Sequence, residues 1–490
     1  MNNFKFEKIA QSIEEKIHRG IFEVGHKLPS VRAACNEFAV SPSTVFKAYY
    51  ELEAKGLIEA RNKSGYYVSL SATQLKKVKH LNEKVTSTKN SATKAKNVDE
   101  MIEEMERSKL GDIKVDFSSA TPSVEMLPIK KLYKSLQTSI LHEKYNLIPY
   151  ENPIGSIELR KQIILQTIRG SKVNPVDDVV ITAGCLEAIG ICINILTENG
   201  DNILIADSSY YNIISLLKNK NVNIHTYDFN QSLNFDSKAF EQVLIEKKIS
   251  LCLITSNFHN PTGATLDTSA KQKIVSIATQ NNINIIEDDV YGDLYFEKNK
   301  PTTLKQFDTE GIVYYCSSFS KTLAPGFRIG YCITGRKSQE FAKQKRLLSL
   351  STNSITQAAL VDFMKTGRFD LNLKNLRKQL HLNMLKYGNA ILNYFPSEIN
   401  IEIPKGGYVF WIEFSASFDG YEFYRKVLKE KILITPGEIF SANGYYKNFI
   451  RISYSKPYNE KIDGALKQIG NLARKHVITK KLPLAMYKKT

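Results

Sequence analysis

One lysine stands in a run of residues that could bind a phosphate and form an imine. The run extends from Ser318 to Arg328 and follows an apolar, strand-like segment at 312–316. The hydroxyls of Ser318 and Ser320 and the guanidinium of Arg328 can hold a phosphate while the amine of Lys321 attacks a carbonyl. Pyridoxal 5′-phosphate carries both groups, so the run predicts a covalent site for this cofactor. An ordinary surface turn rich in Ser and Lys would have a similar sequence. Only partner residues elsewhere in the chain can distinguish a cofactor site from such a turn.

Turns that follow other strand-like runs carry suitable partners. Gly184 and Cys185 lie between a strand-like run and a helix, where backbone N–H groups bind phosphate and glycine allows close approach. Tyr210 follows another such run and can stack on a pyridine ring. Each signal is weak alone, because many turns contain glycine and most aromatic residues lie in cores.

Two further turns could serve the cofactor's ring. Asn260, in Asn-Pro-Thr-Gly, offers an amide to the phenolic oxygen, although this sequence is also a generic turn. Asp288 could keep the pyridine nitrogen protonated, and the hydroxyl of Tyr291 could tune the phenolate. The acidic run 287–289 could instead bind a metal ion, but no histidine or further carboxylate accompanies it, so we expect no metal site.

The elements that must position these residues alternate along the C-terminal part of the chain. Apolar strand-like runs lie at 179–182, 203–206, 251–255, 283–287 and 312–316. Helical stretches separate them, which predicts an α/β fold with a mainly parallel, doubly wound sheet.

The N-terminal part has a different pattern. Residues 4–19 show apolar spacing of helical period, and a second short helix starts near 28–32. Ser41 and Pro42 open a third helix, since serine suits the N-cap and proline the first helical position. Strand-like runs at 57–61 and 65–68 follow. Three helices and a hairpin predict a winged helix-turn-helix.

This head is basic. Residues 1–97 hold 17 Lys and Arg against 9 Glu, a net charge of +8 within a chain of +17. A basic segment favours a polyanionic partner, and the second helix of a helix-turn-helix enters the major groove of double-stranded DNA by its N-terminal end. The candidate DNA contacts are Arg32, Ser41, Ser43, Thr44, Lys47 and Lys63. A helical bundle used for protein contacts is the alternative.

We expect three regions in the chain. They are a DNA-binding domain at 1–70, a polar linker at 71–112 that is helical from Val98 to Arg107, and a cofactor-binding domain at 113–490. The last would divide into a large part (about 150–370) and a small α+β part (113–149 and 371–490). The sequence contains no run of about 18 apolar residues, so we expect no membrane span. The six scattered cysteines suggest reduced thiols of the cytoplasm.

The N-terminal motifs resemble those of the GntR-type winged-helix family over residues 6–70. The shared skeleton is Leu28-Pro29-Ser30-x-Arg32, Val40-Ser41-x-Ser43-Thr44-Val45, Gly56-Leu57-Ile58 and Gly65-Tyr66-x-Val68. Pro42 departs from the family, which often has a DNA-contacting arginine there.

Residues 115–475 resemble fold-type I aminotransferases in the content, order and spacing of their motifs. The resemblance implies that Lys321 forms an aldimine with pyridoxal phosphate and that Asp288 pairs with the pyridinium. It also implies that Tyr291 and Asn260 hold the phenolic oxygen. The phosphate ligands would be Gly184, Cys185, Ser318, Ser320, Arg328 and Tyr150 of the partner subunit. Arg451 would bind a substrate or effector carboxylate, a task that suits a guanidinium. Cys185 and Ser208 depart mildly from the family pattern.

Together the two halves resemble the MocR-type regulators. This implies a homodimeric, bacterial, cytoplasmic protein, nucleoid-associated when bound to DNA, that senses pyridoxal phosphate or an amino compound. The alternative is a working aminotransferase of α-amino acids that carries a DNA-binding head. The residues leave this choice open, because Lys321, Asp288, Tyr291 and Arg451 are all present.

Overall fold

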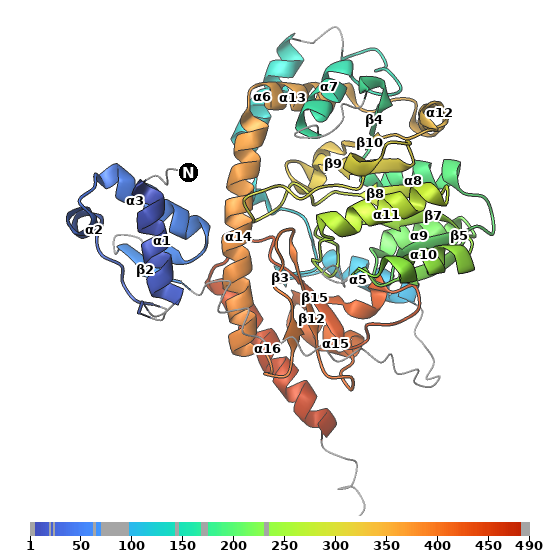
Figure 1. The fold of residues 1–490 in the computed structure, drawn as a ribbon. Coiled ribbons are helices and arrows are strands. Elements are labelled where there is room, and N and C mark those ends of the chain that lie inside the picture. Colours follow the sequence, from blue (N-terminus) through green and yellow to red (C-terminus); the bar gives the residue numbers. More distant parts are fainter. Residues whose placement is uncertain are drawn as a thin grey trace, which may run out of the picture.

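The computed structural model describes residues 5–18, 21–22, 25–61, 65–69, 98–142, 147–167, 175–229 and 235–481. They form two parts, which we call the head (5–69) and the body (98–481). The head stands beside one long helix of the body (Figure 1).

The head is a winged helix-turn-helix, as predicted. Its elements are α1 (Lys5–His18), α2 (Val31–Phe38), α3 (Pro42–Ala54) and the antiparallel strands β1 (Ile58–Arg61) and β2 (Gly65–Val68). Ile13, Val45 and Tyr49 are buried between the helices, as the helical spacing predicts. Residues 62–64, and with them the candidate Lys63, lie outside the described residues.

The two serines that precede α2 and α3 behave differently. Ser30 caps α2, because its hydroxyl accepts a hydrogen bond from the Ala33 N–H at 3.2 Å. Ser41 occupies the cap position of α3 but its hydroxyl contacts the hydroxyls of Ser43 and Thr44, each at 2.9 Å. The Ser41 carbonyl already accepts the Thr44 N–H at 3.0 Å, so the side-chain cap expected from the sequence does not form.

A large sheet organises the body. Within the described residues it has seven strands in the order β4-β10-β9-β8-β7-β5-β6. The strands are β4 (Val179–Thr182), β5 (Asn202–Ala206), β6 (Asn223–Tyr227), β7 (Ile249–Ile254), β8 (Asn284–Asp288), β9 (Val313–Ser318) and β10 (Gly330–Ile333). Only β10 runs antiparallel to its neighbours among these strands, so the predicted mainly parallel sheet is confirmed.

Helices cover both faces of this sheet. Ile203 and Ile205 of β5 share a core with α8 (Cys185–Leu196), whereas Leu204 between them packs with α10 (Ser237–Glu246) and α11 (Thr268–Gln280). This alternation places successive side chains on opposite faces, each buried against helices. The remaining helices of this part are α7 (Ile157–Thr167), α9 (Tyr211–Asn219), α12 (Ser338–Ser349) and α13 (Ser354–Lys365).

A smaller α+β part completes the body. Its strands are β11 (Asn400–Ile401), β12 (Val409–Glu413), β14 (Thr435–Pro436) and β15 (Phe449–Ser453) in an antiparallel sheet, and the parallel pair β3 (Val115–Asp116) and β13 (Ile432–Leu433). Its helices are α14 (Arg368–Tyr394), α15 (Gly420–Lys429) and α16 (Glu460–Lys481).

The sequence did not predict how the two N-terminal helices of the body pack. Helix α5 (Val98–Lys109) buries Met101 and Met105 in the main core of the body, so this stretch of the expected linker is part of the body's packing. Helix α6 (Ile129–His142) packs against α13 near the top of Figure 1. No helix among the described residues is long and apolar enough to cross a membrane.

Candidate cofactor site and DNA-reading helix

Lys321 lies on the short turn that follows β9, at the carboxyl end of that strand. Its Nζ donates a hydrogen bond to the Ala120 carbonyl at 3.0 Å, and its own carbonyl accepts one from the Tyr408 hydroxyl at 2.6 Å. Burial, and after it the charge of Arg451, lowers the pKa of the Lys321 amine to about 8. A larger neutral fraction near pH 7 is what an amine nucleophile needs.

Asp288 ends the neighbouring strand β8 and is buried. The Cys185 thiol donates to its Oδ1 at 3.7 Å, and burial raises the pKa of the Asp288 carboxyl to about 6. A cationic pyridinium beside this carboxylate would offset the burial and favour the ionised form. The structure therefore brings Cys185, an expected phosphate ligand, against the residue expected to pair with the ring nitrogen.

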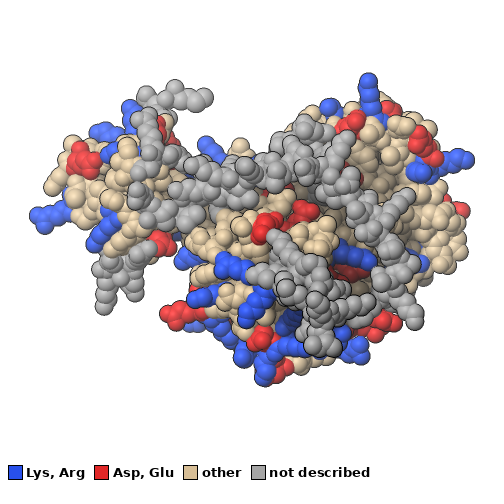
Figure 2. Space-filling view, turned by 90° about the horizontal axis from the view of Figure 1, so that it is seen from below, with Lys and Arg blue, Asp and Glu red and all other residues tan. Residues whose placement is uncertain are grey.

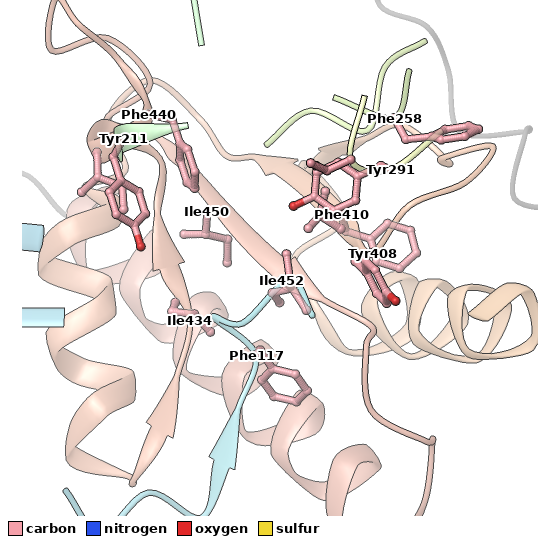
Figure 3. Packing of buried hydrophobic residues seen from close by; sticks show 14 of the residues in the cluster. Phe117, Tyr211, Phe258, Tyr291, Tyr408, Phe410, Ile434, Phe440, Ile450 and Ile452 are labelled. Carbon is pink, nitrogen blue, oxygen red and sulfur yellow. The ribbon is translucent and has the colours of Figure 1, made fainter. Parts of the chain in front are cut away.

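Tyr291 supplies an aromatic wall. The Lys321 Nζ lies 5.7 Å from the centroid of its ring, and the Tyr408 ring lies 6.2 Å away at an interplanar angle of 70°. Figure 3 shows these two tyrosines among the buried residues around Phe410. Burial raises the pKa of Tyr291, and the positive charge of Arg451 opposes this. Asn260, the other residue expected at the phenolic oxygen, accepts a hydrogen bond from Arg451 Nη1 at 2.7 Å.

Three of the residues expected to bind the phosphate, Gly184, Ser320 and Arg328, meet before α8. The φ of Gly184 is +108°, and a Cβ placed there would lie 2.5 Å from Nη2 of Arg328. Arg328 donates to the Ala183 carbonyl at 3.0 Å and approaches the Ser320 Oγ at 3.5 Å. Only glycine fits both this backbone conformation and this approach. The helix start, the guanidinium and the hydroxyl together fit a bound phosphate.

Arg451 lies on β15 and points at the same group of residues. It donates from Nη1 to Asn260 Oδ1 at 2.7 Å and from Nη2 to Thr435 Oγ1 at 3.1 Å and to the Ser118 carbonyl. Its Nε is buried with no hydrogen-bond partner among the described residues. An unsatisfied donor on a buried guanidinium fits a site that receives an anionic group.

Three further candidate residues differ in their surroundings. Tyr210 precedes α9, its hydroxyl accepts from Asn212 Nδ2 at 2.9 Å, and its ring lies 4.6 Å from that of Tyr211. Tyr150 is 83% exposed, which suits a residue that serves another subunit, and Ser318 is buried at the end of β9. The assignment of the site residues to the cofactor stays a prediction.

Sequence reasoning missed four participants. They are the backbone carbonyls of Ser118 and Ala120 and the side chains of Tyr408 and Thr435. The Lys321–Ala120 bond joins residues 201 positions apart, and a backbone carbonyl leaves no mark on the residue type. No local spacing could have revealed these contacts.

The DNA-reading candidates lie at the surface of the head. Ser41, Ser43 and Lys47 are exposed at the start of α3, as is Arg32 on α2, and Thr44 is half-buried. Basic side chains are visible on the head and on the underside of the body in Figure 2. The exposed aromatic residues on α3, Phe46 and Tyr50, are 52% and 50% exposed and were not singled out from the sequence. The sequence signal that could have found them is their spacing, because both lie outside the apolar inner face of α3.

Comparisons with known proteins agree with both parts. Residues 112–469 match the family "Aminotransferase class I and II", and residues 5–68 match "Bacterial regulatory proteins, gntR family". The chain is 33% identical to an uncharacterized HTH-type transcriptional regulator, YdcR of Escherichia coli, over 96% of this chain and 100% of the relative. It is 29% identical to the HTH-type transcriptional regulator NorG of Staphylococcus aureus, over 92% of this chain and all of NorG.

Solved structures agree with the body alone. The α-aminoadipate aminotransferase LysN of Thermus thermophilus, complexed with N-(5′-phosphopyridoxyl)-L-leucine, superposes with a TM-score of 0.71 at 23% identity, covering 77% of this chain and 95% of LysN. The kynurenine aminotransferase of Pyrococcus horikoshii gives a TM-score of 0.72 at 21% identity, covering 80% and 97%. At these identities the likeness establishes the fold and nothing about substrate.

Proposed function

This chain belongs to the gntR family of bacterial regulatory proteins and carries an aminotransferase class I and II domain, and from this we propose that its body holds pyridoxal 5′-phosphate on Lys321 and reports an amino compound to its DNA-binding head. It is a helix-turn-helix transcriptional regulator whose body has the fold of pyridoxal phosphate-dependent enzymes. The cofactor, the effector and the dimer are the parts that we propose.

The observation that carries the proposal is the position of Lys321. Its amine, with a pKa of about 8, lies 5.7 Å from the centroid of the Tyr291 ring and is close enough to Asp288 for that carboxyl to act on its charge. The cradle of Gly184 and Arg328 fits the phosphate of the same molecule. When bound, pyridoxal phosphate supplies an aldehyde that reacts with amines and a ring that withdraws electrons. The residues of this chain would fix its ring, its phosphate and its charge.

Arg451 indicates the chemistry of the effector. Its guanidinium is buried and holds Asn260 by one hydrogen bond. A carboxylate would make a stronger, charge-assisted bidentate pair than this neutral amide does. We therefore expect an amino compound with a carboxylate, whose arrival releases Asn260 toward Tyr291.

A second copy of the chain would complete the site. Apolar side chains are exposed on α6, on the segment 147–157 and on α12: Tyr133, Ile140, Leu141, Ile148, Ile157, Leu347 and Leu348. Exposed apolar side chains are candidates for an interaction surface. Pairing of two chains through such residues would bring Tyr150 of the partner subunit to the phosphate cradle and would place two heads for two half-sites of one operator. A regulator of this design acts in the bacterial cytoplasm, on the nucleoid.

The alternative function is turnover as an aminotransferase. The candidate site contains the residues that such an enzyme needs: Lys321, Asp288, Tyr291 and Arg451. The site is therefore compatible with turnover. Purified protein incubated with amino acids and a keto acid distinguishes the two. Many turnovers per subunit at enzymatic rates would contradict a role as a regulator alone.

The proposed function is tested by DNA footprinting upstream of the gene and its neighbours. We expect a protected site whose pattern changes when pyridoxal phosphate and candidate amino acids are added. The absence of any protection would contradict DNA binding in this region. Protection that ignores both ligands would contradict the sensor.

A further inference from the structure

The side of α14 that faces the head carries a charged contact. Lys378 Nζ lies 3.3 Å from Glu53 Oε2 and 4.2 Å from the centroid of the Tyr50 ring, and both partners belong to α3. The side chains of Lys378 and Glu53 are only 30% and 20% exposed. Partial shielding strengthens both an ion pair and a cation–π contact relative to fully exposed ones.

Two uncharged contacts lie next to this ion pair. His381 donates from Nδ1 to the carbonyl of Ala54, the last residue of α3, at 3.1 Å. Leu385 lies against Gly56, where an added Cβ would fall 1.9 Å from Leu385 Cδ1. The backbone of the head thus approaches α14 as closely as glycine permits. We call Lys378, His381 and Leu385 the α14 dock.

The dock engages one end of the DNA-reading helix and leaves the other end open. Tyr50, Glu53 and Ala54 belong to the second half of α3, whereas the expected base contacts, Ser41 and Ser43, lie exposed at its start. The dock therefore fixes the position of the head without covering the start of α3.

The same turns of α14 also contact the segment that follows β8, the strand that ends in Asp288. His381 stacks on Phe296 with ring centroids 5.0 Å apart and an interplanar angle of 12°. Arg377 places its guanidinium 4.2 Å from the Tyr295 ring and donates to the Asp293 carbonyl at 3.3 Å. Residues 293–296 come directly after Asp288 and Tyr291, so α14 stands between the cofactor site and the head (Figure 1).

We propose that the α14 dock is a latch for the DNA-binding head, and that the segment 289–296 transmits the state of the cofactor site to it through the Phe296–His381 stack. The latch itself follows from the contacts alone. The transmission rests on the proposed function, because it requires a ligand beside Tyr291. A ligand that shifts this segment changes the fit of His381 and so the hold on Ala54.

Hydrogen exchange of the full chain, followed in peptides that cover residues 50–56, tests the latch. Lys378→Glu and Glu53→Lys each place like charges together, and each should speed exchange there about two- to fivefold, which is the effect of losing one exposed ion pair. The double charge reversal should restore the wild-type rate. Lys386→Glu is the matched control, because Lys386 is an exposed lysine of α14 with no ion pair to the head among the described residues.

Equal exchange in all four charge variants would overturn the latch, and so would a double variant that is no slower than the single ones. Unchanged melting of the body shows that the variants are folded. These outcomes need neither cofactor nor DNA.

The transmission is tested in the same peptides with and without pyridoxal phosphate. We expect the cofactor to change their exchange in the wild type and in Phe296→Tyr, which keeps the stacked ring, and not in Phe296→Ala. Bound cofactor, seen by absorbance, without any change at 50–56 would overturn the transmission and leave the cofactor proposal standing. Absent cofactor absorbance would refute the proposed function and with it the transmission, while the charge reversals still decide the latch.

Discussion

The cofactor site and the DNA-reading helix are built in opposite ways. Lys321, Asp288 and Arg451 come from three different strands or turns, and the charges of the buried Asp288 and Arg451 both act on the Lys321 amine. The candidate DNA contacts at the start of α3 follow one another in the sequence, and Ser41, Ser43 and Lys47 are exposed. A change in the first region should have a large effect, because a buried polar group without its partner is costly. We expect exposed residues of the second region to act separately, each through its own contact with DNA.

The largest effect is expected from Lys321→Ala. Removal of the amine abolishes covalent attachment of pyridoxal phosphate, so the protein should lose the absorbance that the cofactor gains on a lysine. Lys321→Arg keeps the positive charge and should fail equally. Lys343→Ala, at an exposed lysine of α12, should retain full absorbance. Absorbance that survives in Lys321→Ala would locate the attachment at another lysine.

The pH dependence of cofactor incorporation should follow Lys321. Because burial lowers the pKa of this amine to about 8, its neutral fraction rises steeply below pH 8 and levels above it. The rate of incorporation should increase about fiftyfold between pH 6 and pH 8, as the neutral fraction does for a pKa of 8. Stopped-flow absorbance measures it, with a free alkyl amine as reference. A rate that keeps climbing past pH 9, as for an ordinary lysine, would contradict a desolvated amine.

Gly184→Ala should weaken the phosphate cradle. Alanine is strained at φ +108° and its Cβ would lie 2.5 Å from Arg328 Nη2. The variant would relieve this strain by moving the turn away from its present geometry. Restoring that geometry on binding would cost about 1–3 kcal/mol, which corresponds to roughly a 5- to 150-fold loss of cofactor affinity, measured by equilibrium titration. Gly190→Ala is the control, since nothing lies within 4 Å of a Cβ at this position of the same helix. Equal affinity of the two variants would place the phosphate elsewhere.

Lys47→Ala probes the exposed region. Loss of one phosphate contact should weaken DNA binding on all sequences alike and reduce the slope of log affinity against log salt by about 1. Lys8→Ala removes an exposed lysine of α1 and should leave the slope unchanged. Filter binding or fluorescence anisotropy at several salt concentrations gives both numbers. A slope unaffected by Lys47→Ala would mean that the start of α3 does not meet the DNA backbone there.

Ser30→Ala should produce the smallest effect, confined to the stability of the head. Its hydroxyl caps α2 through the Ala33 N–H, and loss of such a cap costs about 1 kcal/mol. Ser41→Ala is the comparison, because Ser41 makes no capping hydrogen bond and should cost less. Hydrogen exchange within 31–38 for Ser30→Ala and within 42–54 for Ser41→Ala reports the difference. A greater loss for Ser41→Ala would reverse the order that the two caps predict.

The sequence predicted the elements of both regions because their signals are local. Apolar spacing located α1 and α3, and alternating strand and helix runs predicted a large, mainly parallel sheet, in which the structure places β8 and β9 next to each other. Lys321 and Asp288 were found because the ends of strands and the turns after them have a recognisable composition. The Asn260–Arg451 bond was not predicted, since it joins residues 191 positions apart and depends on how the two parts of the body pack. The failed cap at Ser41 depends on competing hydrogen bonds that residue types alone do not rank.

The contact between head and body was likewise beyond sequence reasoning. Lys378 and Glu53 are 325 positions apart, and each reads as an ordinary charged residue of an amphipathic helix. Only the packing of α3 beside α14 gives the pair a meaning. Through this contact the body, which holds the buried candidate cofactor site, touches the head, which holds the exposed candidate DNA contacts.

The most direct test of the account compares DNA protection by the wild type and by Lys321→Ala, each with and without pyridoxal phosphate, across the region upstream of the gene. We predict protection by both proteins, because the head is intact in both, and a change of its extent or position on adding cofactor in the wild type alone. An equal response of both proteins to the cofactor, or no response of either, would contradict the claim that Lys321 links the cofactor to the reading of DNA.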